Sequence, residues 1–579
     1  MTTNQQILTD LRHFIKQEQE INLEKLMDIW QKPLDIKCKN GESQKIKKID
    51  IEDRIHLRLS FDCDYSRFRT GDMICLHQGD ALQSIFVRQA MLVKETNQQW
   101  LIKVRSLDEK QIKTLKPPFY ADPDGIDLTL FFENVFTELS KGGDEAKNLL
   151  DLIDGRLQAD DIYIDNFDNA ADIAEQEGFN EQQIEAVGYG VGAKYLACIQ
   201  GPAGTGKTRV ISLIAKLLVD EGQAVLVTSH THMAINNMLN KIYQQQVPLV
   251  KVGSSSSGQG LDRQIKLVEN IDLWLERPDH GYVIGATPFA TCTSRLQGFK
   301  FDTVIFDEAS QVTTPLALMA MRTAKRFIFV GDHQQLPPII LSKSVLDTES
   351  AFIFAQLFNT YPKTTVMLAE TYRMNKTLTA WSSQAYYAKK LFASEQSAHR
   401  QFKLPKKPLK YQNILTADQA FIYLQSPSLN KRTVNPAEAD LVADIIYHCV
   451  EAGLESSEIG VVTPYRKQAK QIRNALKKHR ADFFKTIVAD TVERMQGQER
   501  ELIIISCCST DLLFIKNIAG FFFQPQRLNV AITRPKTKLI LIAPRIDFVV
   551  DDAQINAQIK AYHSLINSAY HGDKDDSRD

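Results

Sequence analysis

Eight consecutive residues have the types and spacing of a phosphate-binding loop. They fit the pattern G-x-x-x-x-G-K-[ST] in full, between a β-rich run and a helical stretch, and read Gly201-Pro202-Ala203-Gly204-Thr205-Gly206-Lys207-Thr208. Small residues let backbone N–H groups curl around phosphate oxygens at a helix N-terminus. Lys207 would reach the β- and γ-phosphates, and the Thr208 hydroxyl would ligate Mg²⁺. The loop predicts a nucleoside triphosphate site, whose binding residues are Gly201, Gly204, Thr205, Gly206, Lys207 and Thr208.

Two later segments place polar residues directly after apolar runs. Asp307 and Glu308 follow a run too apolar to be exposed, so we expect them at the tip of a buried strand rather than on the surface. There Asp307 would hold the Mg²⁺ shell and Glu308 would orient or deprotonate the attacking water. Gln335 comes after a third such run, where it could hydrogen-bond a γ-phosphate or water and act as a switch. A purely structural turn is the alternative for Gln335.

Short β-rich runs alternate with helical stretches from about residue 190 onward, which predicts parallel sheets covered on both faces. The first series of runs comprises 195–200, 224–228, 282–286, 303–307 and 326–331. The second series comprises 365–368, 421–424, 459–463, 487–490, 501–506 and 538–543. We therefore expect two α/β domains in tandem, at 176–360 and 361–565, with a disordered charged tail at 566–579.

The first 175 residues have a different pattern. Residues 1–27 have helical periodicity, 38–106 hold alternating strand-like segments with turn signals, and 127–157 become helical again. This pattern favours a helical stalk that carries a small β-barrel-like domain at about 38–120. An ordinary α+β cap is the alternative.

Composition limits the class of protein. The chain has 579 residues, too many for one core, and its 44% hydrophobic and 24% charged residues exclude a disordered, collagenous or coiled-coil chain. Lys plus Arg number 69 and Asp plus Glu number 70, so the net charge of −1 provides no global field for a polyanion. Any nucleic-acid site must be a local patch.

Targeting and cysteine patterns favour a cytoplasmic protein. The eight cysteines form no C-x-x-C pair and no cluster with metal-ligand spacing, which argues against a zinc module, an iron–sulfur cluster or a disulfide framework. We find no signal or transit peptide at the start and no apolar run near the ~20 residues that span a bilayer. No membrane association is expected.

With these three motifs in order, the chain resembles superfamily-one helicases over about 178–545, and more loosely in its N-terminal third. The nearest subgroup is that of the nonsense-mediated-decay RNA helicase and the immunoglobulin-μ-binding helicase. The resemblance implies two tandem RecA-like P-loop domains. Residues 179–187 are similar to the adenine-recognising segment, with Gln183 as the base-reading amide, which implies ATP. Phe179 stands where Leu is commoner.

Downstream motifs imply arginine fingers on the second domain. Residues 368–375 are similar to the family's Tyr-Arg-Met segment, with Thr371 where Gln is usual, and 491–499 and 527–534 precede strands as the family pattern requires. Arg373 and Arg534 would stabilise charge on the γ-phosphate from the facing domain. A surface ion pair is the alternative for each. By resemblance, Glu499 contacts the ribose.

A single nucleic-acid strand would lie on the far face of both domains, held through its phosphates. The resemblance assigns this path to Thr228, Ser229, Thr287, Thr463 and Thr491. Each could instead be a helix N-cap or a turn residue. The basic stretch 465–480 is interpreted mainly as a solvated helix face, with a nucleic-acid contact second, and Trp381, Tyr386 and Tyr387 as core residues.

The leading hypothesis is a monomeric, Mg²⁺-dependent ATPase that moves on single-stranded DNA or RNA and unwinds duplexes, with 5′ to 3′ polarity by resemblance. An ATP-gated clamp that does not unwind is one alternative, since the motifs specify hydrolysis better than strand separation. A helicase–nuclease fusion is another, but the first 175 residues have too little acidic patterning to support it. DNA and RNA are not distinguished.

Overall fold

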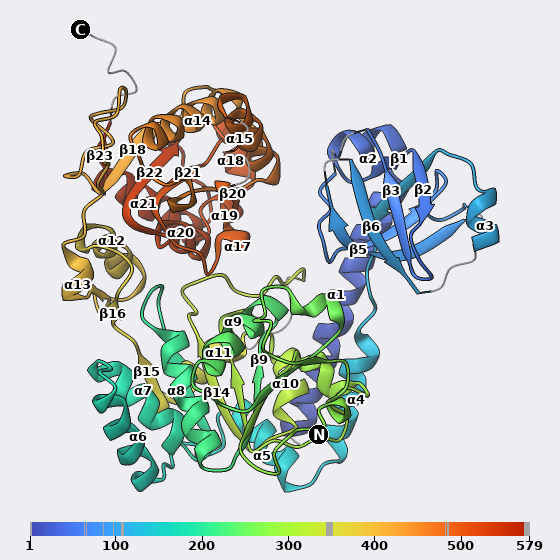
Figure 1. Ribbon diagram of the computed structural model, residues 1–579, viewed down its shortest axis with the longest axis vertical. Helices are drawn as coiled ribbons and strands as arrows, with labels where there is room; N and C mark the ends of the chain where they lie inside the picture. The colour runs from blue at the N-terminus through green and yellow to red at the C-terminus, as the bar shows by residue number, and fades with distance from the viewer. Residues whose placement is uncertain are drawn as a thin grey trace.

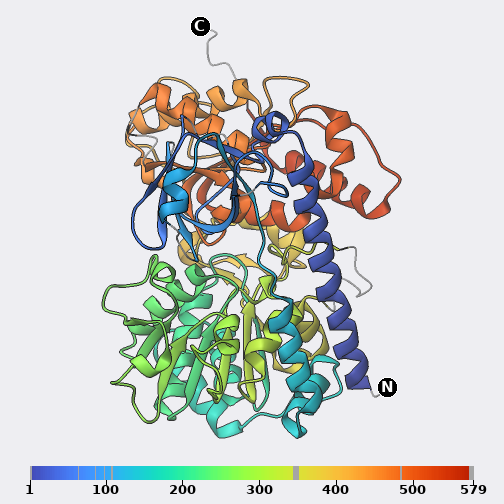
Figure 2. The same cartoon turned by 90° about the vertical axis from the view of Figure 1, so that its right-hand side faces the viewer.

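The computed structural model describes residues 3–572 except 63, 65, 85, 97, 106–108, 343–350, 481 and 483–485. Figure 1 shows two α/β domains, one above the other, with a small barrel beside the upper one. Figure 2 shows the long helix α1 (Thr3–Gln31) running along one side of the molecule, from the lower domain up to the barrel. The N-terminal helix and both tandem domains are therefore confirmed.

The first α/β domain is built on an eight-stranded parallel sheet. Its strand order is β11-β10-β12-β9-β13-β14-β8-β15. The strands are β8 (Leu196–Gln200), β9 (Ala224–Thr228), β10 (Leu249–Val252), β11 (Leu267–Val268), β12 (Tyr282–Gly285), β13 (Thr303–Phe306), β14 (Arg326–Gly331) and β15 (Thr365–Met367). The helices around it are α4 (Thr129–Lys141), α5 (Asp144–Ile153), α6 (Ile164–Gln176), α7 (Glu181–Gly192), α8 (Lys207–Asp220), α9 (His232–Tyr243), α10 (Thr314–Met321) and α11 (Ile353–Thr360).

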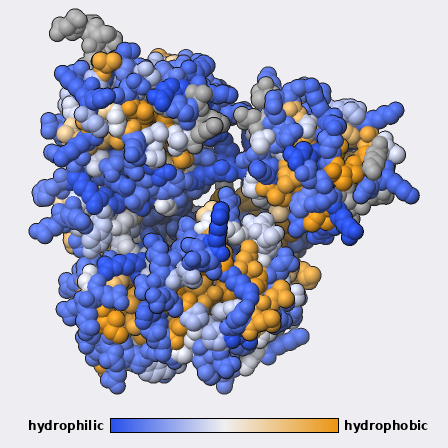
Figure 3. All heavy atoms as spheres, viewed as in Figure 1, coloured by the Kyte–Doolittle hydropathy of each residue, from blue (hydrophilic) through white to orange (hydrophobic). Residues whose placement is uncertain are grey.

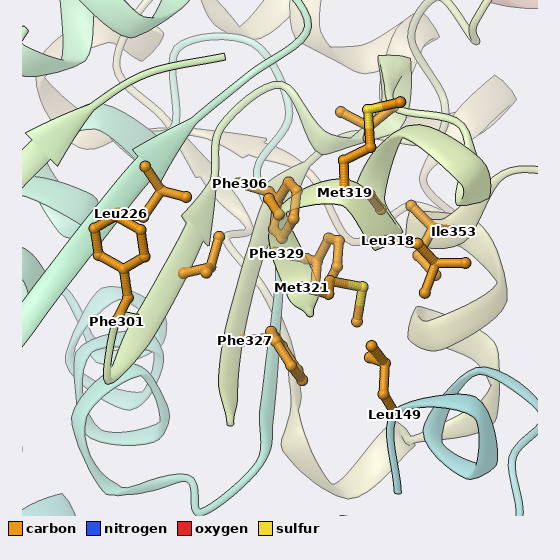
Figure 4. Close-up of a cluster of buried hydrophobic side chains, with 14 of the residues drawn as sticks. Leu149, Leu226, Phe301, Phe306, Leu318, Met319, Met321, Phe327, Phe329 and Ile353 are labelled. Atoms are coloured by element: carbon orange, nitrogen blue, oxygen red, sulfur yellow. The ribbon is translucent and has the colours of Figure 1, made fainter. Parts of the chain in front are cut away.

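Aromatic stacking fixes the two strands at the centre of this sheet. The rings of Phe306 on β13 and Phe329 on β14 stack with centroids 4.4 Å apart and an interplanar angle of 3°. Figure 4 shows them packed among Leu318, Met321 and Ile353 from the covering helices. The acidic residues that follow β13 and β14 are therefore held by a close-packed core.

One strand lies in a different sheet from the one expected. The run at 365–368 was expected to begin the second domain, but β15 pairs in parallel with β8 of the first sheet. Val366 and Leu368 are buried in the first domain's core, and this packing decides the strand's place. The other ten expected strands all form, whereas the short strands β10 and β11 of this sheet were not predicted.

The second α/β domain has a six-stranded parallel sheet with the order β20-β19-β21-β22-β18-β23. Its strands are β18 (Phe421–Gln425), β19 (Ile459–Thr463), β20 (Val488–Thr491), β21 (Arg500–Ser506), β22 (Pro535–Ala543) and β23 (Tyr570–His571). Its larger helices are α12 (Lys376–Tyr386), α14 (Pro436–Glu451), α15 (Arg466–His479), α20 (Pro525–Ile532) and α21 (Ala553–Ser568). Shorter elements are β16 (Glu370–Thr371), β17 (Phe392–Ala393), α13 (Glu395–Ala398), α17 (Val492–Met495), α18 (Leu512–Asn517) and α19 (Ala519–Phe522).

The expected disordered tail is partly wrong. Helix α21 continues to Ser568 with Leu565 and Ile566 buried, and Tyr570–His571 pairs with β18. Apolar packing against the second domain therefore orders residues 566–571. Residues 573–579 lie outside the described part of the chain.

The barrel-like domain is confirmed as a seven-stranded antiparallel sheet with the order β1-β7-β4-β5-β6-β3-β2. Its strands are β1 (Gln44–Ile46), β2 (Lys48–Ile51), β3 (His56–Ser60), β4 (Met73–His77), β5 (Val87–Glu95), β6 (Gln99–Val104) and β7 (Phe119–Pro123), with helices α2 (Leu34–Asn40) and α3 (Glu109–Thr114). Only Lys47 separates β1 from β2, so one bent strand joins the two edges of the sheet. Closure removes the open edges that would otherwise template aggregation.

Helix α1 connects the barrel to the first α/β domain. Its first half packs Leu11 and Phe14 into the core shared with α4, and near its end Trp30 Nε1 donates to Pro123 O at 2.8 Å. Between these two contacts, Glu18 of the same helix accepts the backbone N–H of Leu341 at 2.9 Å. The stalk therefore contacts both the barrel and the segment that follows Gln335.

The basic helix α15 is only partly a solvated face. Arg466 donates to Arg67 O and Lys470 to Asp64 O of the barrel, while Arg473 donates to Ala489 O at 2.6 Å. The interpretation as a solvated face is therefore wrong for Lys470 and Arg473, which are half-buried, whereas Arg466 is exposed. The remaining basic side chains of the stretch, Lys467, Lys477, Lys478 and Arg480, are exposed.

Candidate nucleotide site between the two domains

The phosphate-binding loop connects β8 to α8 in the conformation that its glycines allow. Gly204 and Gly206 have φ of 76° and 86°, in the left-handed region that favours glycine. A Cβ on Gly204 would lie 2.4 Å from Cβ of Arg373. Gly204 is therefore required twice, for its own backbone and for the close approach of the segment that carries Arg373.

A cavity of about 490 Å³ lies over this loop. Its lining brings together seven residues predicted from sequence, namely Gly204, Thr205, Gly206, Lys207, Thr208, Glu308 and Arg373. It also includes six that were missed, namely Arg209, Ser212, Lys241, Gln244, Gln245 and Gly497. Lys241, Gln244 and Gln245 come from the end of α9, whose place over the loop depends on its packing against α8. No local motif could have signalled them.

Lys207 faces the mouth of the loop. Its Nζ donates to Gly201 O at 2.5 Å and to Pro202 O at 3.4 Å. Thr205 Oγ1 also donates to Pro202 O, at 2.9 Å. The carbonyls of Gly201 and Pro202 therefore hold the Lys207 ammonium inside the loop, where the motif predicts that phosphate oxygens bind.

Asp307 and Glu308 extend from the end of β13 toward the loop. Asp307 accepts the N–H of Glu308 at 2.9 Å, and Glu308 has a φ of 50°, a conformation that costs a non-glycine residue about 1–3 kcal/mol. Burial raises the pKa of Asp307, the charge of Glu308 raises it further, and Lys207 offsets part of the rise, leaving the pKa at about 7. The strained backbone directs Glu308 into the cavity.

The acidic residue and the loop hydroxyl fit a magnesium ion. Mg²⁺ prefers oxygen ligands and binds through one or two carboxylates together with phosphate oxygens. Asp307 supplies a buried carboxylate whose charged form lacks solvation, and Thr208 supplies a hydroxyl on the cavity wall. The donor set therefore suits a divalent cation at Asp307 and Thr208.

Gln183 lies next to the loop but not in the cavity lining. Its Nε2 donates to Thr205 O at 3.0 Å, and its Oε1 accepts the N–H of Asn180 at 3.2 Å in the capping box of α7. Its amide thus supports the loop. Nearby, the Arg209 guanidinium lies 3.9 Å from the centroid of the Phe179 ring.

The two candidate arginine fingers differ in position. Arg373 lines the cavity, where its Nε donates to Glu499 Oε2 at 2.7 Å and its Nη1 to Thr533 O at 3.0 Å. Burial raises the pKa of Glu499, but the charge of Arg373 and its hydrogen bond outweigh this, so the pKa is lowered. Arg373 and Glu499 therefore form a charged pair at the edge of the site.

Arg534 is buried in its own domain and does not line the cavity. Its Nε donates to Val530 O at 2.8 Å and its Nη2 to Thr533 Oγ1 at 3.2 Å. Burial lowers its pKa to about 9. The structure thus brings Arg373 to the cavity but not Arg534.

The residues assigned to nucleic acid lie at the carboxyl ends of parallel strands. Thr228 ends β9, Thr463 ends β19 and Thr491 ends β20, while Thr287 follows β12. Thr228, Ser229, Thr463 and Thr491 are buried, and Thr287 is half-buried. All five lie at or just after the carboxyl ends of their strands, and their contacts with a nucleic-acid strand stay a prediction.

Comparisons with known protein families identify the two α/β domains. Residues 178–274 and 279–343 match one family model and residues 350–545 match another, and both are described as an AAA domain. Two successive parts of the chain thus match models of AAA domains.

Curated relatives are named as DNA helicases. The DNA replication ATP-dependent helicase/nuclease dna2 of Schizosaccharomyces pombe is 29% identical over 389 residues, 62% of this chain and 27% of that protein. The DNA2 protein of Saccharomyces cerevisiae is 29% identical over 440 residues, 71% of this chain and 28% of that protein. This chain thus spans about a quarter of their length. These names do not point to the RNA-decay and immunoglobulin-μ-binding subgroup.

The DNA polymerase alpha-associated DNA helicase A of Schizosaccharomyces pombe is 28% identical over 437 residues, 63% of both proteins. Among solved structures, an Arterivirus nonstructural protein 10 (helicase) covers 89% of this chain at 14% identity, with a TM-score of 0.38.

Within the described residues, no helix combines the length and apolar character needed to cross a membrane.

Proposed function

We propose that this chain is an ATP-dependent nucleic-acid helicase that hydrolyses ATP to ADP and phosphate while moving 5′ to 3′ on a single strand. One observation carries the proposal. The cavity at the P-loop is lined by Lys207, Thr208 and Glu308 from the first domain and by Arg373 and Gly497 from the second. A nucleotide in this cavity would contact both domains, so its binding and hydrolysis would change how they sit against each other.

Each side chain has a defined role in this reaction. The loop N–H groups and Lys207 would bind the phosphates, and Mg²⁺ held by Thr208 and Asp307 would neutralise their negative charge. Glu308 would take the proton of the attacking water as the bond from the γ-phosphorus to the bridging oxygen breaks. Arg373 would stabilise charge on the γ-phosphoryl group from the second domain. Arg534 would do so only after leaving its present hydrogen-bond partners, Val530 O and Thr533 Oγ1.

The strand would lie across the carboxyl edges of both sheets, near Thr228, Ser229, Thr287, Thr463 and Thr491. Figure 3 shows a hollow where the two domains and the barrel meet, with hydrophilic residues on the side of the upper domain and hydrophobic ones on the side of the barrel. Most of these residues are buried, so their hydroxyls would contact the nucleic-acid strand only when the two domains move. The names of the relatives favour DNA over RNA. Placement in the RNA-decay subgroup, a monomeric state and a cytoplasmic location remain our expectations from the sequence.

The test combines ATPase and unwinding assays. We expect ATPase activity that requires Mg²⁺, is stimulated more by single-stranded DNA than by RNA of equal length, and is absent from Lys207→Ala. A duplex with a 5′ tail should be unwound and one with a 3′ tail should not. Stimulated hydrolysis without unwinding on either tail would favour the ATP-gated clamp.

A further inference from the structure

A chain of buried hydrogen bonds connects the first domain to the second beside the nucleotide site. It begins at Asp332, the residue after β14, which is 1% exposed. Gln335 Nε2 donates to Asp332 Oδ2 at 2.8 Å, and Gln200 Nε2 donates to Oδ1 at 3.0 Å. Tyr387, which follows α12, donates from its hydroxyl to Asp332 Oδ2 at 2.7 Å.

The chain continues into the second domain through Asn529 on α20. Asn529 Nδ2 donates to the Tyr387 hydroxyl at 2.8 Å and to Gln334 O at 2.8 Å. Both functions of the Tyr387 hydroxyl, donor and acceptor, are therefore used. Ser382 Oγ fixes the amide of Asn529 by donating to its Oδ1 at 2.9 Å.

From Asn529 the contacts reach both candidate arginine fingers. Thr533 Oγ1 donates to Asn529 O at 2.7 Å and accepts from Arg534 Nη2 at 3.2 Å. Thr533 O accepts from Arg373 Nη1 at 3.0 Å. Hydrogen bonds, together with the covalent links within Asn529 and Thr533, thus connect Gln335 to the two arginines.

The carboxylate of Asp332 makes this chain sensitive to the position of Gln335. Among the described residues, Asp332 forms no ion pair, and its carboxylate is held by hydrogen bonds, which include one from the N–H of Gln334 to Oδ1 at 3.2 Å. An unsatisfied buried acceptor is unfavourable, and more so for a charged group. If Gln335 turned toward a γ-phosphate, Asp332 would lose one donor, and Tyr387 with Asn529 would have to readjust.

We propose that Tyr387 is a positioning residue that couples the Gln335 turn to the placement of Arg373 and Arg534. This inference rests on the proposed ATPase function and assigns to it a residue that does not line the nucleotide cavity. Burial raises the pKa of Tyr387 well above its ordinary value, so the hydroxyl keeps its proton for Asp332. Trp381 and Tyr386, which neighbour it on α12, pack against the second domain's core instead.

The variant Tyr387→Phe removes only the hydroxyl, and Tyr386→Phe is its matched control. The Tyr386 hydroxyl is buried without a hydrogen-bond partner among the described residues. We expect Tyr387→Phe to lower kcat of the strand-stimulated ATPase about tenfold or more, since hydrogen bonds to a charged group are lost at the transition state. KM for ATP should stay within about twofold because Tyr387 does not touch the cavity. Tyr386→Phe should leave both values unchanged.

A second variant tests the same hydrogen-bond chain at another residue, so that the conclusion does not depend on the folding of one variant. Asn529→Leu cuts the same chain one step farther on, and combining it with Tyr387→Phe should add little to either single loss, as expected for residues acting in one chain. If Tyr387→Phe is stimulated as strongly as wild type, the coupling is overturned while the ATPase function stands. If wild type itself shows no strand-stimulated ATPase, both proposals fail.

Discussion

Gln496 Nε2 lies 3.3 Å from Glu308 Oε2, so a residue of the second domain hydrogen-bonds to the carboxylate that the first domain directs into the nucleotide cavity. Gln496 lies just before Gly497, which also lines the cavity. Glu308 is thus in contact with the element whose position would change when the domains close. A substitution at Glu308 can remove its role as a general base while keeping its contact with Gln496.

Glu308→Gln keeps the size of the side chain and an oxygen for Gln496 but removes the base. We expect ATP binding to be nearly unchanged, while turnover falls by about 10²–10⁴-fold, the usual contribution of a general base. Fluorescent-nucleotide binding and phosphate release measure the two separately. Glu269→Gln, at an exposed position, is the control and should behave as wild type. Strong residual turnover in Glu308→Gln would remove Glu308 from the mechanism.

Arg373 should contribute to turnover through the planar geometry of its guanidinium. Its Nε and Nη1 are held by Glu499 and Thr533 O, an arrangement that a lysine ammonium cannot reproduce. We expect Arg373→Ala to lower kcat by about 10³-fold or more, and Arg373→Lys to recover little of that loss. Arg480→Ala on the surface is the control. Steady-state ATPase assays measure these losses of kcat. Full activity of Arg373→Lys would contradict the proposed role of the guanidinium.

The local part of the site was predictable from sequence, because its residues are neighbours in the chain. The P-loop occupies Gly201–Thr208, and Glu308 follows a buried parallel strand whose carboxyl end must lie at the same edge of the sheet. Which side chains of the second domain reach the site between the domains was not predictable in the same way. Arg534 belongs to a long motif match, yet its side chain is directed into its own domain, where it donates to the carbonyl of Val530 on α20.

Contacts between distant segments account for the other differences. A helix with the charge pattern of α15 is typical of a solvated face, and its partner Arg67 lies 399 residues away in the sequence. The run at 365–368 has the composition of a strand, but nothing in it indicates which of two parallel sheets it will join. Only the burial of Val366 beside β8 decides this.

Gly204→Ala should impair the site more than an equivalent change elsewhere. Its new Cβ would lie 2.4 Å from Arg373 Cβ and 2.8 Å from Thr371 Oγ1. Gly298→Ala is the matched control, because Gly298 has a φ of 77° and open space around its Cβ position. Both substitutions strain the backbone by about 1 kcal/mol, but only Gly204→Ala also separates the P-loop from Arg373. We expect at least a tenfold loss of kcat per folded molecule for Gly204→Ala alone, measured by ATPase assay with circular dichroism as the fold check.

The barrel contains a buried ion pair whose loss should destabilise it locally. Lys37 and Asp122 pair at 1% and 0% side-chain exposure, and His77 Nε2 lies 3.2 Å from the same carboxylate. Lys37→Met would leave Asp122 buried without its main partner, at a cost of about 3–5 kcal/mol. Lys47→Met breaks the exposed pair with Asp62 and should cost about 0–1 kcal/mol. Hydrogen exchange of β4 and β7 measures the change, with β8 and β14 as internal reference. Equal protection of β4 and β7 in both variants would contradict it.

The same pair predicts how the barrel depends on pH. Burial raises the pKa of Asp122, but hydrogen bonds from His77, Lys37 and Ser43 outweigh it, so its pKa in the folded protein lies below the ordinary 3.8. A carboxyl whose pKa is lower when folded stabilises the protein above its unfolded value, and this contribution is lost as the pH falls through the folded value. We therefore expect wild type to exceed Asp122→Asn in protection of β4 and β7 at neutral pH, with the difference shrinking below pH 3.8. A difference that instead grew with acid would mean that Asp122 is held protonated in the folded barrel.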